Sequence, residues 1–342
     1  MGKEKQKCGQ TVLGADVSLE KFDAGIAVPD SLDDLRSIKV RTFPRSPLGV
    51  EQCLEWIDER GGVDSVVMEA TGYYSRDLAK WFHEQRPELP VFVVNPFQIK
   101  RFGESLGVRT KTDAQDARVI ACFGVGRRLW LPHEKAEILR ELHRLHKDRT
   151  ALVNMLKSER LRASGAERDA VAIKVHKSLC EELKRGIETL DQAIQAMVKE
   201  QAPLKADVAL LKSIPGVGAQ TATLILGALG DLRRFDRSRQ LAAFVGVSPR
   251  QKDSGKSVHG RAVLCKKGSP QVRAALFLSA MAAVRVKGPF KEIFQGLVVR
   301  GKARMAALGA IMRRLLVLMR AVLISAKPYD PIDHGKALAK TI

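Results

Sequence analysis

Four acidic residues in the first third of the chain have types and positions that suit a metal site. Asp16 and Glu69 each follow a short apolar run, while Asp113 and Asp116 open a segment with helical spacing. Residues three apart share one helical face, so the last two carboxylates point the same way. Mg²⁺ prefers carboxylate oxygens, and two ions about 3.5–4 Å apart can stabilise both oxygens exchanged in a phosphodiester displacement. The pattern is consistent with such a site.

Each of these acids also has an ordinary structural explanation. Thr112 and Gln115 form a T-x-x-Q pattern typical of a helix capping box, and the helix dipole favours Asp113 in the first turn. Asp16 could equally be a turn residue. The spacing alone leaves the metal and structural interpretations open.

A second group of residues combines hydroxyls, cations and glycines between Val247 and Pro270. A serine beside a glycine, as at Ser254, can attack phosphorus while cations neutralise the developing charge, and His259 could serve as its base. Alternatively, the segment only holds phosphate. The cations that we expect to contact nucleic acid are Arg250, Lys252, Lys256, Arg261, Lys266 and Lys267.

A third motif, Ile214-Pro215-Gly216-Val217-Gly218, joins two apolar helical segments and resembles a helix-hairpin-helix. In that motif glycines let the backbone approach a phosphate, so we expect Pro215, Gly216 and Gly218 to contact nucleic acid independently of sequence. A plain helical hairpin is the alternative.

Charge separates the chain into two parts. The 342 residues carry a net charge of +20, but residues 206–327 hold 22 Lys and Arg against 5 Asp and Glu, so almost all the excess lies there. This distribution predicts a polyanionic partner for the basic part. The N-terminus lacks a signal-peptide pattern, no apolar run is long enough to span a membrane, and five scattered cysteines predict neither disulfides nor zinc. We expect a cytoplasmic protein with no membrane partner.

Apolar periodicity predicts an α/β region followed by helices. Runs at 11–15 and 24–28 predict a hairpin, runs at 65–68 and 91–94 predict strands, and 74–85 has helical spacing. Residues 134–201 contain no proline and predict long helices, in the manner of a coiled-coil hairpin broken near Gly165. The predicted divisions are 1–128, an α/β metal domain; 129–205, a coiled-coil or oligomerisation region; 206–327, an all-α domain; and 328–342, a tail.

These motifs together resemble the transposases, or recombinases, of the insertion sequence 110 family. The similar segments include GADVSLEKFDAGIAV, VVMEATGYYSRDLA, TKTDAQDARVIA, IPGVGAQTA and RQLAAFVGVSPRQKDSGKSVHGRA, in that order over nearly the whole chain. The resemblance implies a RuvC-like domain of RNase H type, a coiled coil and a helical transposase domain. It assigns the DEDD metal ligands to Asp16, Glu69, Asp113 and Asp116, and the serine nucleophile to Ser254, with Ser257 in reserve.

The resemblance also implies partners and a cofactor. The ion would be Mg²⁺ or Mn²⁺, and an element-encoded bridge or seek RNA would pair with donor and target DNA, so that the protein need not read bases itself. A homodimer or homotetramer, associated with a prokaryotic nucleoid, would place the serine of one subunit beside the acids of another. Two other functions stay open: a metal-dependent nuclease or junction resolvase that uses water, and a non-catalytic nucleic-acid-binding protein.

Overall fold

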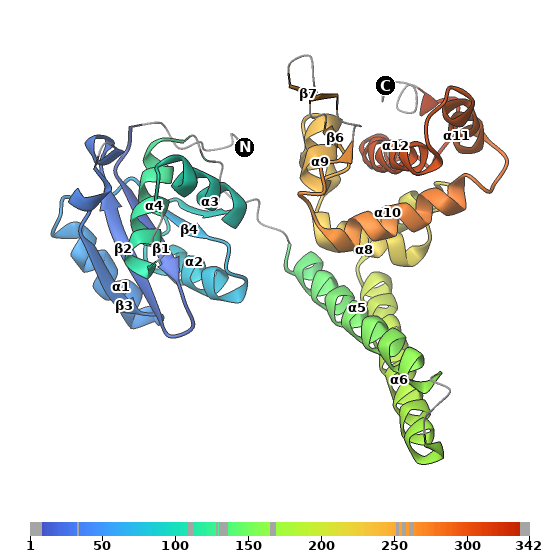
Figure 1. Cartoon of the computed structure of the whole chain (residues 1–342), viewed down its shortest axis with the longest axis horizontal. Helices are drawn as coiled ribbons and strands as arrows, with labels where there is room; N and C mark the ends of the chain where they lie inside the picture. Colours follow the sequence, from blue (N-terminus) through green and yellow to red (C-terminus); the bar gives the residue numbers. More distant parts are fainter. Residues whose placement is uncertain are drawn as a thin grey trace. The chain divides into compact units, whose positions relative to one another are not determined.

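The computed structural model describes residues 9–32, 34–108, 112–127, 129, 136–164, 169–250, 253–254, 258–259 and 263–335, with backbone alone at 253–254 and 258–259. It divides into two compact units, residues 1–134 and 135–342 (Figure 1). In the described residues, no helix is long and apolar enough to cross a membrane.

The N-terminal unit contains a five-stranded sheet in the order β3-β2-β1-β4-β5. β1 and β2 form the predicted antiparallel hairpin, and β4 and β5 run parallel to β1. β3, which sequence reasoning missed, is an edge strand in which Phe43 alone is buried. The strands are β1 (Val12–Val17), β2 (Lys21–Ala27), β3 (Val40–Pro44), β4 (Ser65–Glu69) and β5 (Val91–Val94).

Helices cover both faces of this sheet, because the strands bury alternate residues on opposite sides. Leu13, Ala15 and Met68 pack in one apolar cluster with α1 and α2, and Val12 and Val67 pack in another with α3 and α4. A mixed α/β fold of three layers results. The helices are α1 (Pro47–Asp58), α2 (Tyr73–Gln85), α3 (Pro96–Ser105) and α4 (Asp113–Val125), with short 3₁₀ turns at Pro29–Leu32 and Leu35–Ser37.

α4 lies unusually close to the central strand. A Cβ on Gly14 of β1 would stand 2.2 Å from the backbone nitrogen of Ala121 and 2.6 Å from the carbonyl oxygen of Ala117. Gly124, on the helix side of the same contact, would meet the side chain of Val12 at 2.5 Å. The absence of side chains at these two glycines therefore sets the depth at which α4 sits on the sheet.

The C-terminal unit is almost entirely helical. Two long helices, α5 (Glu137–Ala163) and α6 (Ala170–Glu200), lie side by side (Figure 1), as the proline-free segment predicted. Gly165, the predicted break, lies outside the described residues. The remaining helices are α7 (Ala202–Lys212), α8 (Ala219–Leu229), α9 (Ser238–Val245), α10 (Pro270–Ala283), α11 (Pro289–Val299) and α12 (Arg304–Ser325), with a 3₁₀ turn, η3, at Leu232–Arg234.

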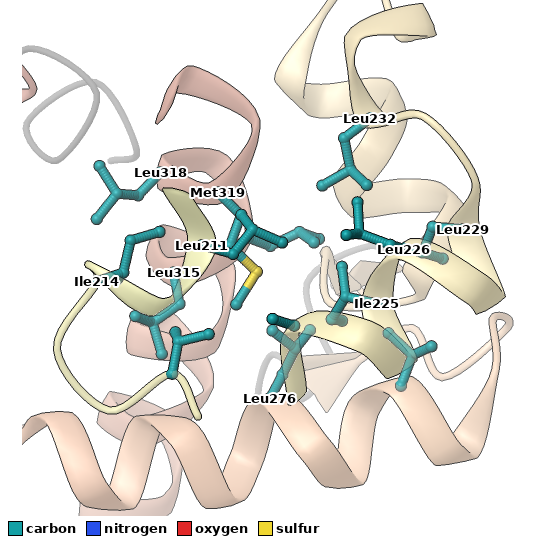
Figure 2. Packing of buried hydrophobic residues seen from close by; sticks show 14 of the residues in the cluster. Leu211, Ile214, Ile225, Leu226, Leu229, Leu232, Leu276, Leu315, Leu318 and Met319 are labelled. Atoms are coloured by element: carbon teal, nitrogen blue, oxygen red, sulfur yellow. The ribbon is translucent and has the colours of Figure 1, made fainter. Parts of the chain in front are cut away.

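One apolar core holds these helices together. Figure 2 shows side chains from α7, α8, η3, α10 and α12 meeting in it, among them Leu211, Leu226, Leu232, Leu276 and Met319. Leu142 of α5 and Ile194 of α6 belong to the same cluster, so the long helices are anchored in this core.

Polar contacts reinforce that anchor. The buried His146 of α5 shares a hydrogen bond of 3.0 Å between Nε2 and Oγ1 of Thr223 on α8, and burial lowers the pKa of this histidine to about 4. His146 is therefore a neutral structural residue at pH 7. Arg149 pairs with Asp191 of α6 through two hydrogen bonds of 2.6 and 3.1 Å.

Candidate functional site

The candidate acids gather on one face of the N-terminal sheet, near the C-terminal ends of β1 and β4. Asp16 is the next residue after Ala15, and Glu69 the next after Met68, where the parallel β1–β4 register ends. Strand alternation places both on the side of Val12 and Val67, which is the side covered by α4. Asp16 lies within β1 and Glu69 is the last residue of β4, rather than following the strands as predicted.

α4 brings the other two carboxylates to that face. Thr112 caps the helix by accepting a 3.2 Å hydrogen bond at Oγ1 from the backbone N–H of Gln115, so Asp113 and Asp116 occupy the first turn. The predicted capping box is only half formed, because the Gln115 side chain accepts a hydrogen bond from Arg118 instead. Asp113 is exposed, whereas Asp116 is half-buried.

The electrostatics of Asp16 record this crowding of negative charge. Burial is the largest cause of a pKa raised to about 6, and the charges of Asp116 and Asp113 follow it in order of effect. Glu69 and Asp23 add smaller contributions to the same pKa. A cation bound near Asp16 would stabilise the ionised form of this half-buried carboxyl, because four other carboxylates lie close to it.

Asp23 and Lys21 are members of this group that sequence reasoning missed. Asp23 lies directly opposite Asp16 in the β1–β2 register and is only 5% exposed. The Lys21 ammonium lies between two carboxylates, 3.3 Å from Oδ2 of Asp23 and 3.0 Å from Oδ2 of Asp113. Thr42 of β3 donates a hydrogen bond to the other oxygen of Asp23. The one available signal was the alternation that places Lys21 and Asp23 on the same strand face as Asp16.

The acid group suits a hard divalent cation in chemistry and charge. Its donors are carboxylate oxygens, and the negative charges of the neighbouring acids add to burial in raising the pKa of Asp16. Within the described part of the chain, however, no three metal-ligating side chains converge closely enough to enclose an ion. Asp113 is paired with Lys21 instead, so binding an ion through all four acids requires side-chain rearrangement.

Ser254 lies in a narrow β-hairpin of the C-terminal unit. The base of this hairpin is the antiparallel pair β6 (Pro249–Arg250) and β9 (Val263–Leu264), and its outer part is the pair β7 (Asp253–Ser254) and β8 (Val258–His259). Figure 1 shows β7 farther from α9 than β6 is. The register places Ser254 opposite Val258, and Asp253 opposite His259. The side chain of Ser254 lies outside the described part of the structure.

The remaining predicted contacts fall into described and undescribed groups. Arg250, Lys266 and Lys267 are exposed around the base of the hairpin, and Lys266 has a left-handed backbone with φ of 57°. Lys252, Lys256, Ser257 and Arg261 lie outside the described residues.

The helix-hairpin-helix-like segment forms the turn between α7 and α8. Gly216 has φ of +82°, and a Cβ there would stand 2.4 Å from the carbonyl oxygen of Ser279 on α10. This glycine thus serves packing within the unit. Gly218, the N-cap of α8, is exposed with no atom within 4 Å of a Cβ, so its backbone is open to a ligand. Pro215, which precedes Gly216 in the turn, is half-buried.

Comparison with known proteins places these features in a family. Residues 208–295 match the model described as Transposase IS116/IS110/IS902 family, and residues 13–166 match a transposase model of the IS110 DEDD type. The pilin gene-inverting protein of Moraxella bovis is 30% identical over 334 residues, 95% of this chain and 99% of that protein.

Two further relatives are transposases by name. The transposase for insertion sequence element IS1111A of Coxiella burnetii is 30% identical over 255 residues, 65% of this chain and 66% of that protein. The probable family 20 transposase of Pseudomonas aeruginosa is 28% identical over 289 residues, 74% of this chain and 82% of that protein. The matches span both compact units, the acids and the segment leading to Ser254. The chain belongs to the IS110 family of transposases and is a DNA recombinase.

Proposed function

We propose that the protein cuts and rejoins the DNA of an insertion sequence through a phosphoserine link at Ser254, with a divalent ion at the acids of the N-terminal unit. The observation that carries the proposal is the concentration of carboxylates at the C-terminal ends of β1 and β4 and in the first turn of α4, where burial and the neighbouring negative charges raise the pKa of Asp16 to about 6. A cluster of carboxylates of this kind has a use in phosphoryl transfer, where a cation and a phosphate must meet.

Asp16, Glu69, Asp113 and Asp116 would hold Mg²⁺ or Mn²⁺, which when bound draws charge from the scissile phosphate. Of these acids, Asp113 begins paired with Lys21, so it must leave that ammonium to become a ligand. Asp23 retains the Lys21 ammonium and the Thr42 hydroxyl as partners during that exchange. The RuvC-like assignment of this domain is part of the proposal, and the order and layering of the sheet are compatible with it.

Ser254 supplies the nucleophile in this proposal. Its Oγ attacks phosphorus, a phosphorus–oxygen bond to deoxyribose breaks, and the hydroxyl proton of the serine leaves to a base while the departing deoxyribose oxygen takes up a proton. The phosphoserine link is itself a phosphodiester, so the free energy of the broken bond is conserved. A deoxyribose hydroxyl from another strand can therefore attack the same phosphorus, rejoin the DNA and release the serine. Arg250, Lys266 and Lys267 at the hairpin base supply positive charge for the phosphate oxygens.

An element-encoded guide RNA that pairs with donor and target DNA is the proposed source of sequence specificity. The 22 Lys and Arg against 5 Asp and Glu in residues 206–327 support this, since they suit contacts to phosphate backbones of either nucleic acid. Gly218 at the open N-terminus of α8 is the proposed backbone contact of the helix-hairpin-helix-like turn.

A homodimer or homotetramer would complete the site by bringing one subunit's serine to another's acids. The long helices offer a surface for such association, because Val171, Val175 and Leu179 of α6 are spaced four apart and are 69%, 59% and 43% exposed. We therefore retain 129–205 as an oligomerisation region between the metal domain, 1–128, and the transposase domain, 206–327, with 328–342 as a tail.

The deciding experiment looks for the covalent link. The protein, element-junction DNA, RNA transcribed from the element flank and Mg²⁺ are incubated, and a denaturant-resistant, protease-sensitive DNA adduct is sought. We expect the adduct with wild type and with Ser248→Ala, and its loss with Ser254→Ala while DNA binding persists. Loss with Ser257→Ala in place of Ser254→Ala would move the nucleophile by three residues. Nicked DNA without any adduct would refute the phosphoserine mechanism in favour of attack by water.

A further inference from the structure

Phe244 is an aromatic side chain exposed on the cationic unit. Its ring is 53% exposed on α9, and it is the single large aromatic residue exposed to this degree among the described residues of 135–342. Because Phe244 is exposed, its ring does not contribute the stability that a buried phenylalanine would. Arg237 and Arg239 make the surface beside it basic. An exposed aromatic ring on a basic surface suits a ligand that has a planar group to stack on the ring and a negative charge to pair with the cations.

The ring is braced from behind. The Arg234 guanidinium lies 4.4 Å from the ring centroid of Phe235 and 5.5 Å from that of Phe244, and the two rings are themselves 5.5 Å apart. Arg234 is held in turn by donating a 3.1 Å hydrogen bond from Nη2 to the carbonyl oxygen of Leu229. A ring fixed in this way loses little side-chain entropy when something stacks on its open face.

The neighbours of Phe244 on the helix face are suited to nucleic acid. Gln240 and Phe244 lie four residues apart on one face of α9, Arg237 is the N-cap residue just before the helix, and all three are exposed. Arg239, the residue before Gln240, is exposed as well. Cations beside an open ring are the combination by which proteins hold unpaired nucleotides, with the ring on the base and the cations on the phosphates.

Backbone hydrogen bonds join the end of α9 to the segments that flank the hairpin carrying Ser254. The Lys266 N–H donates a 3.0 Å hydrogen bond to the carbonyl oxygen of Gly246, two residues after Phe244, and the Cys265 N–H donates one of 2.9 Å to Ser248. β6 begins at Pro249, and chain length limits the Cα distance from Arg250 to Ser254 to about 14 Å. The ring and the proposed nucleophile thus belong to one local structure.

We propose that Phe244, braced by Arg234, is a stacking platform for an unpaired base of the DNA strand that becomes joined to Ser254. The inference rests on the proposed function in one respect, the choice of strand. A strand cut at the serine has a base beside the break that has lost a stacking neighbour, and the platform adjoins the hairpin that holds the cut end. Stacking there would fix the cut strand until the second strand arrives.

The experiment measures binding apart from cleavage. In a Ser254→Ala background, junction DNA with single-stranded arms carries one 5-iododeoxyuridine at successive positions, and ultraviolet crosslinks are mapped on the protein. We expect crosslinking to Phe244 from one position near the cut. Phe244→Leu should weaken DNA binding about tenfold, the effect of losing one stacked base, whereas Phe244→Trp should retain it. Leu278→Ala, an equally exposed apolar position at 64%, is the control that should change nothing.

An abasic nucleotide tests the same contact from the DNA side. Placed at the crosslinking position, it should weaken binding of the parent protein by the same factor and leave binding of Phe244→Leu unchanged. Equal DNA binding by the parent and Phe244→Leu would overturn the platform. So would an effect of Phe244→Leu on RNA alone, or on subunit association measured by sedimentation. These readouts need no adduct, so they remain informative even if the phosphoserine mechanism fails.

Discussion

The substitution Gly14→Ala, which adds one methyl group to the central strand β1, should move the acids of α4 away from those of the sheet. In Gly14→Ala the new Cβ would lie 2.2 Å from the backbone nitrogen of Ala121, where ordinary contact begins at 3.4 Å, so α4 must move by about 1.2 Å. The obstructing atoms are backbone, which cannot swing aside as the end of a side chain can. Overpacking of this kind costs about 1–3 kcal/mol, and we expect the upper end.

The functional consequence follows from the position of α4. Its first turn holds Asp113 and Asp116, while Asp16 and Glu69 stay on the sheet, so the shift separates the two halves of the acid group. A misplacement of about 1 Å can reduce a catalytic rate about 100-fold. We therefore expect Gly14→Ala to lower metal-dependent cleavage by that order and the melting temperature by roughly 10 °C.

Gly103→Ala is the control for this experiment. A Cβ on Gly103 of α3, which also packs on α4, would lie 3.4 Å from Cγ1 of Val119, an ordinary contact. This change should leave cleavage unaltered and hold or raise the melting temperature, because alanine favours helix over glycine by about 1 kcal/mol. Cleavage is measured well below the melting temperature of each variant. Wild-type cleavage and melting in Gly14→Ala would refute the close contact of α4 with β1, and lower melting with intact cleavage would refute the role of α4 in placing the acids.

Two further predictions concern charge and the turn between α7 and α8. Because the pKa of Asp16 is raised to about 6 from 3.8, the folded state holds its proton more tightly, and this group's contribution to stability falls as pH rises through that interval. Protons and cations compete for the carboxyl, so the melting-temperature rise produced by Mg²⁺, measured from pH 5 to 8, should diminish below about pH 6. Asp16→Asn should melt higher than wild type at pH 7.5 without Mg²⁺ and lose both the Mg²⁺ effect and cleavage; a lower melting temperature would contradict the charge repulsion. Gly216→Ala, with φ of +82° and a Cβ 2.4 Å from Ser279, should destabilise the C-terminal unit by about 1–3 kcal/mol in denaturant unfolding. Gly218→Ala, with φ of −87° and open space, should cost only about 0.5–1 kcal/mol, because alanine is a poorer N-cap than glycine, and it should also weaken DNA binding; a destabilisation as large as that of Gly216→Ala would contradict this assignment.

Sequence reasoning succeeded where local pattern decides structure. The apolar runs of β1, β2 and β4 predicted strands because each buries its residues along most of its length, and β5 was predicted by its β-branched run, which buries alternate residues. Thr112 predicted the start of α4 because a cap depends on residues three apart. β3 was missed because its residues other than Phe43 are exposed or half-buried, so the strand is defined by its partner β2 rather than by its own composition.

The part of the site that could not be predicted from the sequence depends on contacts between residues far apart in the chain. Asp23 stands between Phe22 and Ala24 in a strand that reads simply as alternating, and its importance appears only when the β1–β2 register sets it against Asp16. The contact of Lys21 with Asp113 joins residues 92 positions apart and depends on the depth of α4 on the sheet. The bracing of Phe244 by Arg234 likewise follows from how α9 packs after the η3 turn.

The separation of charge between the two units has a physical consequence for the acids. A single nearby ammonium, Lys21, already takes one oxygen of Asp113, and each further cation of this kind would neutralise another carboxylate. Had the acids been built into residues 206–327, with 22 Lys and Arg, ion pairs would compete with any metal for every oxygen. Their place in the near-neutral part keeps Asp16 among other carboxylates, and burial together with the charges of these carboxylates raises its pKa. On the proposed function, this separation lets the basic unit bind the phosphates of nucleic acid without its cations forming ion pairs with the acids.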